Sequence, residues 1–254
     1  MQSSIVDVRT SDGVADAYLA RPDDDRSHPP VLFIMDAIGV RPRIEAMADR
    51  IAADGYVVLA PNVFYRAGRA PVLPLPDLGD PDNRASFMKA VRPLIEQLTA
   101  ERAERDGAAY LDFLADLAPG SVAITGYCMG GRLGWRIAAA HPDRVAVMAS
   151  FHGGGLVTDA EDSPHRSAGD LKAELYFGHA DQDPSMTPEQ IAVLEQALKD
   201  AGARYRSELY EGAAHGYTMA DTAAYDQAAC ERHFTVLFAL LGRVLEDHCD
   251  RLEI

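Results

Sequence analysis

Apolar residues recur with two different periods along the chain, one typical of strands and one typical of helices. Short, continuous apolar runs rich in β-branched residues indicate strands that are buried on both faces of a sheet. Before them, two alternating segments flank Ser11-Asp12-Gly13, which indicates a hairpin. The expected strands cover residues 5–10, 14–20, 31–35, 56–60, 121–125, 144–150, 173–177 and 205–210.

Between these strands, apolar residues recur at helical spacing and predict helices. Residues 42–54 carry such a stripe, and Gly55 ends it. Further helices are expected at 86–117 (with interruptions at Pro93 and Gly107), 132–140, 188–200 and 222–247. The alternation of strands and helices predicts an α/β fold: a mostly parallel sheet of about eight strands with helices on both faces, forming one domain over 1–254.

Residues 61–85 follow neither period. This segment holds several Pro and Gly residues, with Tyr65, Arg66 and Arg69 among them. A long irregular segment inside a compact domain is usually functional or mobile.

The composition excludes several classes of function. The formal net charge of −15 argues against binding to nucleic acid or to an anionic membrane. No apolar window is long enough to span a bilayer, and the N-terminus lacks the pattern of a signal peptide. Cys128, Cys230 and Cys249 form no evident disulfide framework or metal pair, so a cytoplasmic protein without a cofactor is expected, with Cys230 and Cys249 as core or surface filler.

The segment Gly126-Tyr127-Cys128-Met129-Gly130-Gly131 lies between an expected strand and an expected helix. Gly two residues before and two after a nucleophilic residue is the pattern of a nucleophile elbow. The turn is so tight that a β-carbon at either flanking Gly would collide with backbone. The helix N-terminus favours negative charge and would therefore stabilise a Cys128 thiolate. Alternatively, such a turn holds a phosphate or forms a corner around a buried Cys.

Two other strand ends carry groups that could complete a catalytic triad. Asp181 and Asp183 follow strand 173–177, and His215 follows strand 205–210. The chain order of nucleophile, acid and histidine is that of the α/β-hydrolases. His215 would accept the thiol proton, and one of the two aspartates would orient the imidazole. The other aspartate would form a turn.

The chain resembles the dienelactone hydrolase family, a cysteine branch of the α/β-hydrolase fold, over essentially its whole length. The residues that carry the resemblance are the elbow at 126–131, Met35-Asp36-Ala37-Ile38-Gly39, Asp183-Pro184 and His215-Gly216. The resemblance favours Asp183 as the triad acid, because Pro188 follows it by five residues. It implies that the backbone N–H groups of Ala37 and Met129 form the oxyanion hole.

Two positions depart from the family pattern. Asp36 stands where the family usually has Glu, whose carboxylate contacts the resting thiol; alternatively, Asp36 caps the following helix. Met219 stands four residues after His215, where the namesake enzymes have an arginine that binds the substrate carboxylate. The candidates to replace that arginine are Arg66, Arg69, Arg84, His152 and His179.

The leading hypothesis is a hydrolase of small esters or lactones that uses Cys128, Asp183 and His215 for catalysis and Asp36, Ala37 and Met129 for substrate binding, as a monomer or homodimer. A thioesterase is an alternative. A cysteine amidohydrolase is another, although Tyr217 stands where those enzymes have Glu. A third is a non-catalytic scaffold that binds ligands or partners. The acidic cluster 179–183 is interpreted as part of the triad rather than as a metal site.

Overall fold

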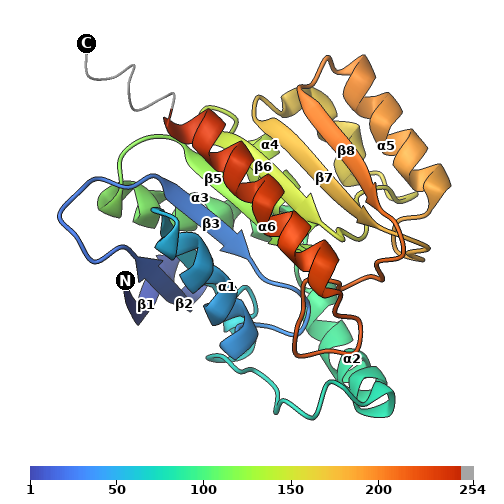
Figure 1. The fold of residues 1–254 in the computed structure, drawn as a ribbon, viewed down its shortest axis with the longest axis horizontal. Helices are drawn as coiled ribbons and strands as arrows, with labels where there is room; N and C mark the ends of the chain where they lie inside the picture. Colours follow the sequence, from blue (N-terminus) through green and yellow to red (C-terminus); the bar gives the residue numbers. More distant parts are fainter. Residues whose placement is uncertain (247–254) are drawn as a thin grey trace.

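Eight strands form one sheet in the computed structural model, which describes residues 1–246 (Figure 1). The strands are β1 (Gln2–Thr10), β2 (Gly13–Arg21), β3 (Pro30–Ile34), β4 (Val57–Pro61), β5 (Val122–Tyr127), β6 (Val145–Phe151), β7 (Glu174–Ala180) and β8 (Tyr205–Tyr210). Their spatial order is β1-β2-β4-β3-β5-β6-β7-β8. Only the β1–β2 and β2–β4 pairs are antiparallel, so the expected α/β fold with a mostly parallel sheet is confirmed.

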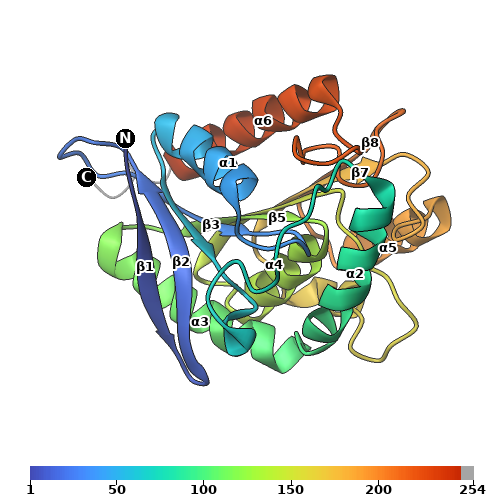
Figure 2. The ribbon, with the colours of Figure 1, turned by 90° about the horizontal axis from the view of Figure 1, so that it is seen from below.

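Helices cover both faces of this sheet. They are α1 (Pro42–Ala53), α2 (Pro81–Glu96), α3 (Ala100–Leu117), α4 (Met129–Ala140), α5 (Pro188–Asp200) and α6 (Gln227–Leu241), with short helical turns at Tyr65–Ala67, Pro164–Asp170 and Gly242–Glu246. Figure 2 shows α1 and α6 on one face, and α3 and α4 on the other. Helix α2 lies beyond the carboxyl ends of the central strands, where it can cover a site at that edge of the sheet (Figure 1).

The helical region 81–117 differs from the expectation in its start and in its break. Helix α2 begins at Pro81, earlier than predicted, because the Asp80 side chain caps its first turn. The break lies at 97–99, where Thr99 caps α3, and not at Pro93 or Gly107. Gly107 does not end the helix: it brings α3 close to α4, since a β-carbon there would lie 2.6 Å from a methylene carbon of Ile137.

The boundaries of two other helices also differ. Helix α4 begins at Met129, directly after Cys128, rather than at residue 132. Helix α6 begins at Gln227 rather than at residue 222, because Thr222 closes a turn with Met219 and the Asp226 carboxylate provides the cap. The predicted end of that helix at 247 and the prediction for Cys249 lie outside the described residues.

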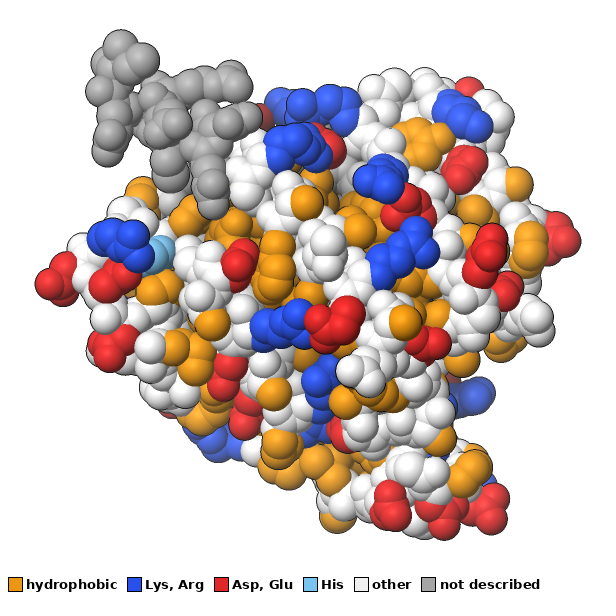
Figure 3. Space-filling view, viewed as in Figure 1, with side chains coloured by type: hydrophobic (Ala, Val, Ile, Leu, Met, Phe, Trp, Pro, Cys, Tyr) orange, Lys and Arg blue, Asp and Glu red, His pale blue; other side chains and the backbone are white. Residues whose placement is uncertain are grey.

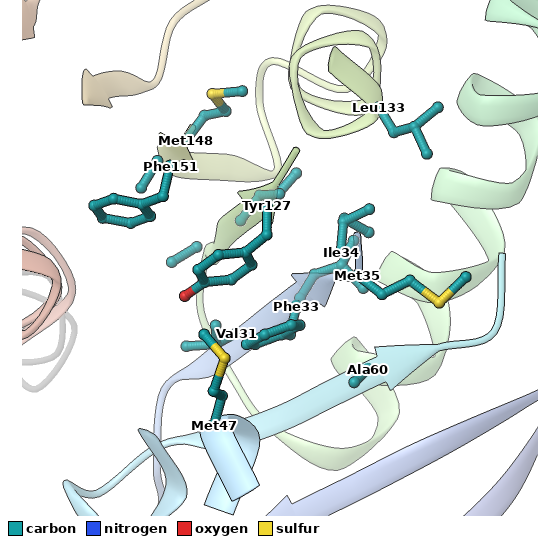
Figure 4. Packing of buried hydrophobic residues seen from close by; sticks show 14 of the residues in the cluster. Val31, Phe33, Ile34, Met35, Met47, Ala60, Tyr127, Leu133, Met148 and Phe151 are labelled. Carbon is teal, nitrogen blue, oxygen red and sulfur yellow. The ribbon is translucent and has the colours of Figure 1, made fainter. Parts of the chain in front are cut away.

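The central strands lie in an aromatic and aliphatic core. Tyr127 at the end of β5 stacks on Phe33 of β3 with 4.6 Å between ring centroids, and Phe151 of β6 lies on its other side. Met47 of α1 and Leu133 of α4 approach this layer from opposite faces (Figure 4). Every residue of β3, β4 and β5 is buried, so the carboxyl ends of these strands form a rigid base.

The surface shown in Figure 3 mixes acidic, basic and apolar side chains, with acidic groups gathered at the end of the molecule formed by α2. Within residues 1–246, no helix is both long enough and apolar enough to cross a bilayer.

Candidate active site

Cys128 occupies a strained turn between β5 and α4. Its backbone has φ of 55° and ψ of −118°, a conformation that non-glycine residues seldom adopt. A β-carbon on Gly126 would lie 2.2 Å from the carbonyl oxygen of Gly130, and one on Gly130 would lie 2.3 Å from the carbonyl oxygen of Ile34. Both flanking glycines are therefore required by backbone contact, as the sequence predicts. The turn leaves the Cys128 side chain half-buried at the N-terminus of α4.

The loops after β7 and β8 bring Asp183 and His215 together. His215 Nδ1 lies 2.6 Å from Asp183 Oδ2. The other carboxylate oxygen accepts hydrogen bonds from the Ser185 backbone N–H at 2.8 Å and from the Ser185 hydroxyl at 2.7 Å. Asp183 is buried and can point only one oxygen at the imidazole, so Ser185 fixes the orientation of the pair.

The charges at this site favour a protonated His215. Burial alone would lower the pKa of His215, but the Coulombic interactions and hydrogen bonds with Cys128 and Asp183 outweigh it and raise that pKa to about 10. Burial would raise the pKa of Asp183, but the hydrogen bonds from His215 and Ser185 lower it overall. A carboxylate, an imidazole and a thiol in this order can move a proton to and from sulfur.

Asp181 has a different position from Asp183. Its carboxylate accepts the backbone N–H of Gly212 at 3.0 Å and so joins the loops after β7 and β8. The sequence left open which of the two aspartates contacts His215. In the structure Asp183 contacts His215, whereas Asp181 hydrogen-bonds to the loop after β8.

Asp36 lies at the end of β3 in a buried ion-pair cluster. Its two oxygens lie 2.7 and 3.1 Å from the guanidinium of Arg41, which also pairs with Asp221. The interpretation of Asp36 as a helix cap is wrong: the N-cap of α1 is Arg41, and no side chain in the described part of the chain caps that helix. Arg41 also contacts the sulfur of Met219 at 3.4 Å, so a cation from the loop after β3 reaches the position where the family arginine was missing.

A cavity of about 360 Å³ lies above these groups. Its wall contains Cys128, His215, Asp36 and Ala37. Apolar side chains of α2 and of the segment directly before α2 cover it. Apolar surface dominates the lining, as is typical of small-molecule sites. The full set of lining residues is Asp36, Ala37, Ile38, Leu78, Pro81, Arg84, Ala85, Met88, Cys128, His152, His215, Gly216, Met219, Thr222 and Ala223.

Only two of the five candidate replacements for the missing arginine line the cavity. Arg84 and His152 are in its wall. Arg66 instead pairs with Asp12 and Asp106, and Arg69 pairs with Asp7. His179 is buried outside the cavity and stacks on Phe177.

Sequence reasoning missed Ser185 and Arg41. The spacing Asp183-Pro184-Ser185 carried a usable signal, because a hydroxyl two residues after an aspartate can close a local turn onto it. The Asp36–Arg41 pair carried no comparable signal, since it depends on how the loop before α1 folds back.

The cysteine amidohydrolase alternative loses support at this site. Tyr217, which stands where cysteine amidohydrolases have Glu, is fully buried and donates its hydroxyl to the carbonyl oxygen of Gly178 at 3.0 Å. No group of His, Cys, Asp and Glu side chains within 1–246 could hold a metal ion.

Cys128 lies in a turn after β5, and the loops that carry Asp183 and His215 follow β7 and β8. Together with the strand order, these positions define the fold as that of an α/β-hydrolase. The chain belongs to the dienelactone hydrolase family, because the model of the "Dienelactone hydrolase family" matches residues 15–245. It is a hydrolase of this type, which counts against a non-catalytic scaffold.

Individual relatives agree with this assignment. The "Putative carboxymethylenebutenolidase" of Salmonella typhi is 30% identical over 226 residues, which cover 85% of this chain and 77% of that protein. The "Carboxymethylenebutenolidase" of Rhodococcus opacus is 28% identical over 201 residues, which cover 79% of this chain and 74% of that protein. The crystal structure of the "Putative Dienelactone Hydrolase" of Klebsiella pneumoniae matches this chain with a TM-score of 0.82 at 22% identity. The match covers 95% of this chain and 98% of that chain, and it supports the fold alone.

Proposed function

We propose that the protein hydrolyses small carboxylic esters or lactones with Cys128 as nucleophile, His215 as general base and acid, and Asp183 as the group that orients His215. The observation that carries this proposal is the 2.6 Å contact between His215 and Asp183 beside Cys128, with Cys128 and His215 lining one cavity. Burial from bulk water strengthens each electrostatic contact in this arrangement.

In acylation, the Cys128 thiolate attacks the ester carbonyl carbon. A carbon–sulfur bond forms, and the carbonyl π electrons move to oxygen. When this tetrahedral intermediate collapses, the carbon–oxygen bond to the alcohol breaks, and His215 gives its proton to the leaving oxygen. In deacylation, neutral His215 takes a proton from water, the resulting hydroxide attacks the thioester, and the thiolate leaves as the acid forms.

The oxyanion hole of this mechanism consists of the backbone N–H groups of Ala37 and Met129. Ala37 directly follows Asp36 at the end of β3, and Met129 begins α4, so its N–H has no partner inside that helix. Two such donors aimed at a developing negative charge are typical of acyl-transfer enzymes.

The cavity supports a small, largely apolar substrate that carries one anionic group. Arg84 of α2 lines the wall, and its guanidinium lies near Gly216, next to His215. Among the described residues no carboxylate pairs with Arg84, so its charge is available to a substrate. Asp36 is held by Arg41 and would shape the cavity rather than contact the thiol.

The test is hydrolysis of a short-chain p-nitrophenyl ester and of a small lactone by wild type, Cys128→Ala and the matched control Cys230→Ala. Cys230 is buried away from the cavity, so its loss should leave the rate within about twofold of wild type. Cys128→Ala should lower kcat by about a thousandfold or more. Equal rates in wild type and Cys128→Ala would contradict the proposal.

Thioesters are a second substrate class that the same acyl chemistry would accept, and an acyl-thiocholine assayed beside the oxygen ester compares the two. The proposal includes a cytoplasmic location, based on the free thiols of Cys128 and Cys230, and a monomer or homodimer in solution.

A further inference from the structure

Arg41 is a buried cation between two loops that both line the cavity. It ends the loop after β3 and is 3% exposed. Its guanidinium pairs with the carboxylate of Asp36 in the same loop and with that of Asp221 in the segment after His215. Although burial by itself lowers the pKa of Arg41, the two carboxylates raise it above its ordinary value. The guanidinium is therefore charged in the folded protein.

Protein groups occupy every nitrogen of this guanidinium. Nη1 donates to Asp36 Oδ1 at 2.7 Å and to the carbonyl oxygen of Gly39 at 3.1 Å. Nη2 donates to Asp36 Oδ2 and to Asp221 Oδ1, each at 3.1 Å, and lies 3.4 Å from the sulfur of Met219. Nε donates to the second oxygen of Asp221. Arginine has five N–H groups in a rigid fork, so this set of contacts leaves Arg41 no donor for a substrate.

Arg41 holds both ends of a tight turn that contains Ala37. Within this turn the Gly39 N–H donates to the carbonyl oxygen of Asp36 at 3.2 Å, and the Ile38 N–H donates to the Asp36 side chain at 3.1 Å. The guanidinium binds the Asp36 carboxylate at one end and the Gly39 carbonyl oxygen at the other. The peptide groups between these ends cannot rotate without breaking one of these contacts.

Arg41 also ties this turn to the segment that carries the general base of the proposed mechanism. Asp221 lies 180 positions from Arg41 and six residues after His215. Between them the Met219 N–H donates to the carbonyl oxygen of Gly216 at 2.8 Å, so this segment forms a turn of its own. His215, Gly216 and Met219 all line the cavity. One guanidinium therefore fixes the turn after β3 relative to the loop after β8.

We propose that Arg41 is a positioning residue for the oxyanion hole: by clamping the turn after β3 against the segment after β8, it holds the Ala37 N–H where negative charge develops. This inference rests on the proposed ester hydrolysis. A hydrogen bond weakens steeply when its donor is misdirected, so the oxyanion hole requires a fixed donor. Both half-reactions pass through a tetrahedral oxyanion, so a displaced donor slows both while binding of the uncharged ester changes little.

The test separates acyl transfer from thiol reactivity. Hydrolysis of a p-nitrophenyl ester needs the oxyanion hole, whereas alkylation of Cys128 by iodoacetamide displaces iodide from a saturated carbon and forms no oxyanion. Arg41→Lys keeps the positive charge, but its single ammonium group cannot bind both ends of the turn and Asp221 together. This variant should lower kcat roughly tenfold or more at nearly unchanged KM, and Cys128 should alkylate within about twofold of the wild-type rate.

Arg66→Lys is the matched control. Arg66 also pairs with two carboxylates, those of Asp12 and Asp106, and it does not line the cavity. The same substitution there should leave both the hydrolysis rate and the alkylation rate of the folded protein at their wild-type values. Unchanged kcat in Arg41→Lys would overturn the assignment of Arg41. So would equal decreases in kcat and in the alkylation rate, because loss of folding or a displaced His215 produces that result.

A second variant keeps the test open if Arg41→Lys does not fold. Asp221→Asn removes one charge at a side chain that is 33% exposed and leaves the pair between Arg41 and Asp36 in place. A decrease in kcat of roughly three- to tenfold at an unchanged alkylation rate supports the proposal, and an unchanged kcat overturns it.

Failure of this inference is distinguishable from failure of the proposed function. Hydrolysis that depends on Cys128 but not on Arg41 or Asp221 would overturn the role of Arg41 and leave the proposed function intact. If Cys128→Ala hydrolyses the ester as fast as wild type, both proposals fail.

Discussion

At the scale of single residues, the site depends on side chains that hold other side chains. Ser185 uses both its backbone N–H and its hydroxyl to bind one oxygen of Asp183, which leaves the other oxygen for His215. The hydroxyl also lies 3.2 Å from His215 Nδ1. Ser185 is therefore a positioning residue for the pair.

Replacing Ser185 by Ala should lower kcat more than it changes KM, because the hydroxyl acts through Asp183 and does not line the cavity. The expected decrease in kcat is roughly three- to tenfold, as for loss of one hydrogen bond to a charged group. Steady-state kinetics of Ser185→Ala and Ser185→Thr check this, with the exposed Ser11→Ala as control. A purely structural role would instead lower the amount of folded enzyme at unchanged kcat.

Thiol reactivity gives a second prediction at this scale. His215 accepts the thiol proton in the proposed mechanism, so His215→Asn should slow the alkylation of Cys128 by iodoacetamide at pH 7 by about tenfold or more. Mass spectrometry of the peptide that contains Cys128 measures the rate. Equal rates in wild type and His215→Asn would mean that the imidazole does not activate the sulfur.

At the scale of elements, Gly107 determines how closely α3 packs on α4. A β-carbon at this position would meet the Cγ1 atom of Ile137 at 2.6 Å and its Cγ2 atom at 2.8 Å, and a β-branched side chain cannot easily move away.

Gly107→Ala should therefore lower the free energy of unfolding, although Ala favours helix formation by ~1 kcal/mol. Overpacking costs about 1–3 kcal/mol, so the net change should be a loss of roughly 1 kcal/mol. Urea unfolding followed by the fluorescence of the single tryptophan, Trp135, measures it. The control is Gly169→Ala, where a β-carbon would meet no atom of the described residues within 4 Å. A stabilised Gly107→Ala protein would show that helix propensity outweighs the contact.

The elements also show how far the sequence alone could lead. All eight strands and the elbow were predicted, because buried parallel strands are continuous apolar runs and because the turn at Cys128 requires two glycines. The break in 81–117 was misplaced, because Gly107 is a packing contact with a residue 30 positions away and local sequence does not encode it. The pairing of Arg41 with Asp221 is likewise a contact between residues 180 positions apart.

At the scale of the whole molecule, buried neutral histidines make stability depend on pH. Burial lowers the pKa of His179 to about 4 and that of His233 to about 3, whereas a histidine in the unfolded chain titrates near ~6.5. Above that value neither state is protonated, so these groups cost nothing. As the pH falls from ~6.5 toward 4, the unfolded chain takes up protons that the folded protein does not.

The free energy of unfolding should therefore decrease between pH 6.5 and 4, by up to ~1.4 kcal/mol per pH unit for each such histidine. Urea titrations at pH 7, 6 and 5 measure the slope. The His179 ring stacks on Phe177, and its Nε2 has no hydrogen-bond partner among residues 1–246. His179→Phe should therefore reduce the slope by up to ~1.4 kcal/mol per pH unit, the contribution of one proton. An unchanged slope in His179→Phe would contradict this account.

The most direct test of the central claim is to identify the acyl-enzyme. Wild-type protein is mixed with a p-nitrophenyl ester, quenched in acid within the first turnovers and digested, and the peptides are analysed by mass spectrometry. We predict that the acyl group is attached to the sulfur of Cys128 as a thioester, and that Cys128→Ala gives no adduct. Rapid turnover by wild type with the acyl group on another residue, or with a Cys128→Ala variant of equal activity, would contradict the assignment of Cys128 as the nucleophile.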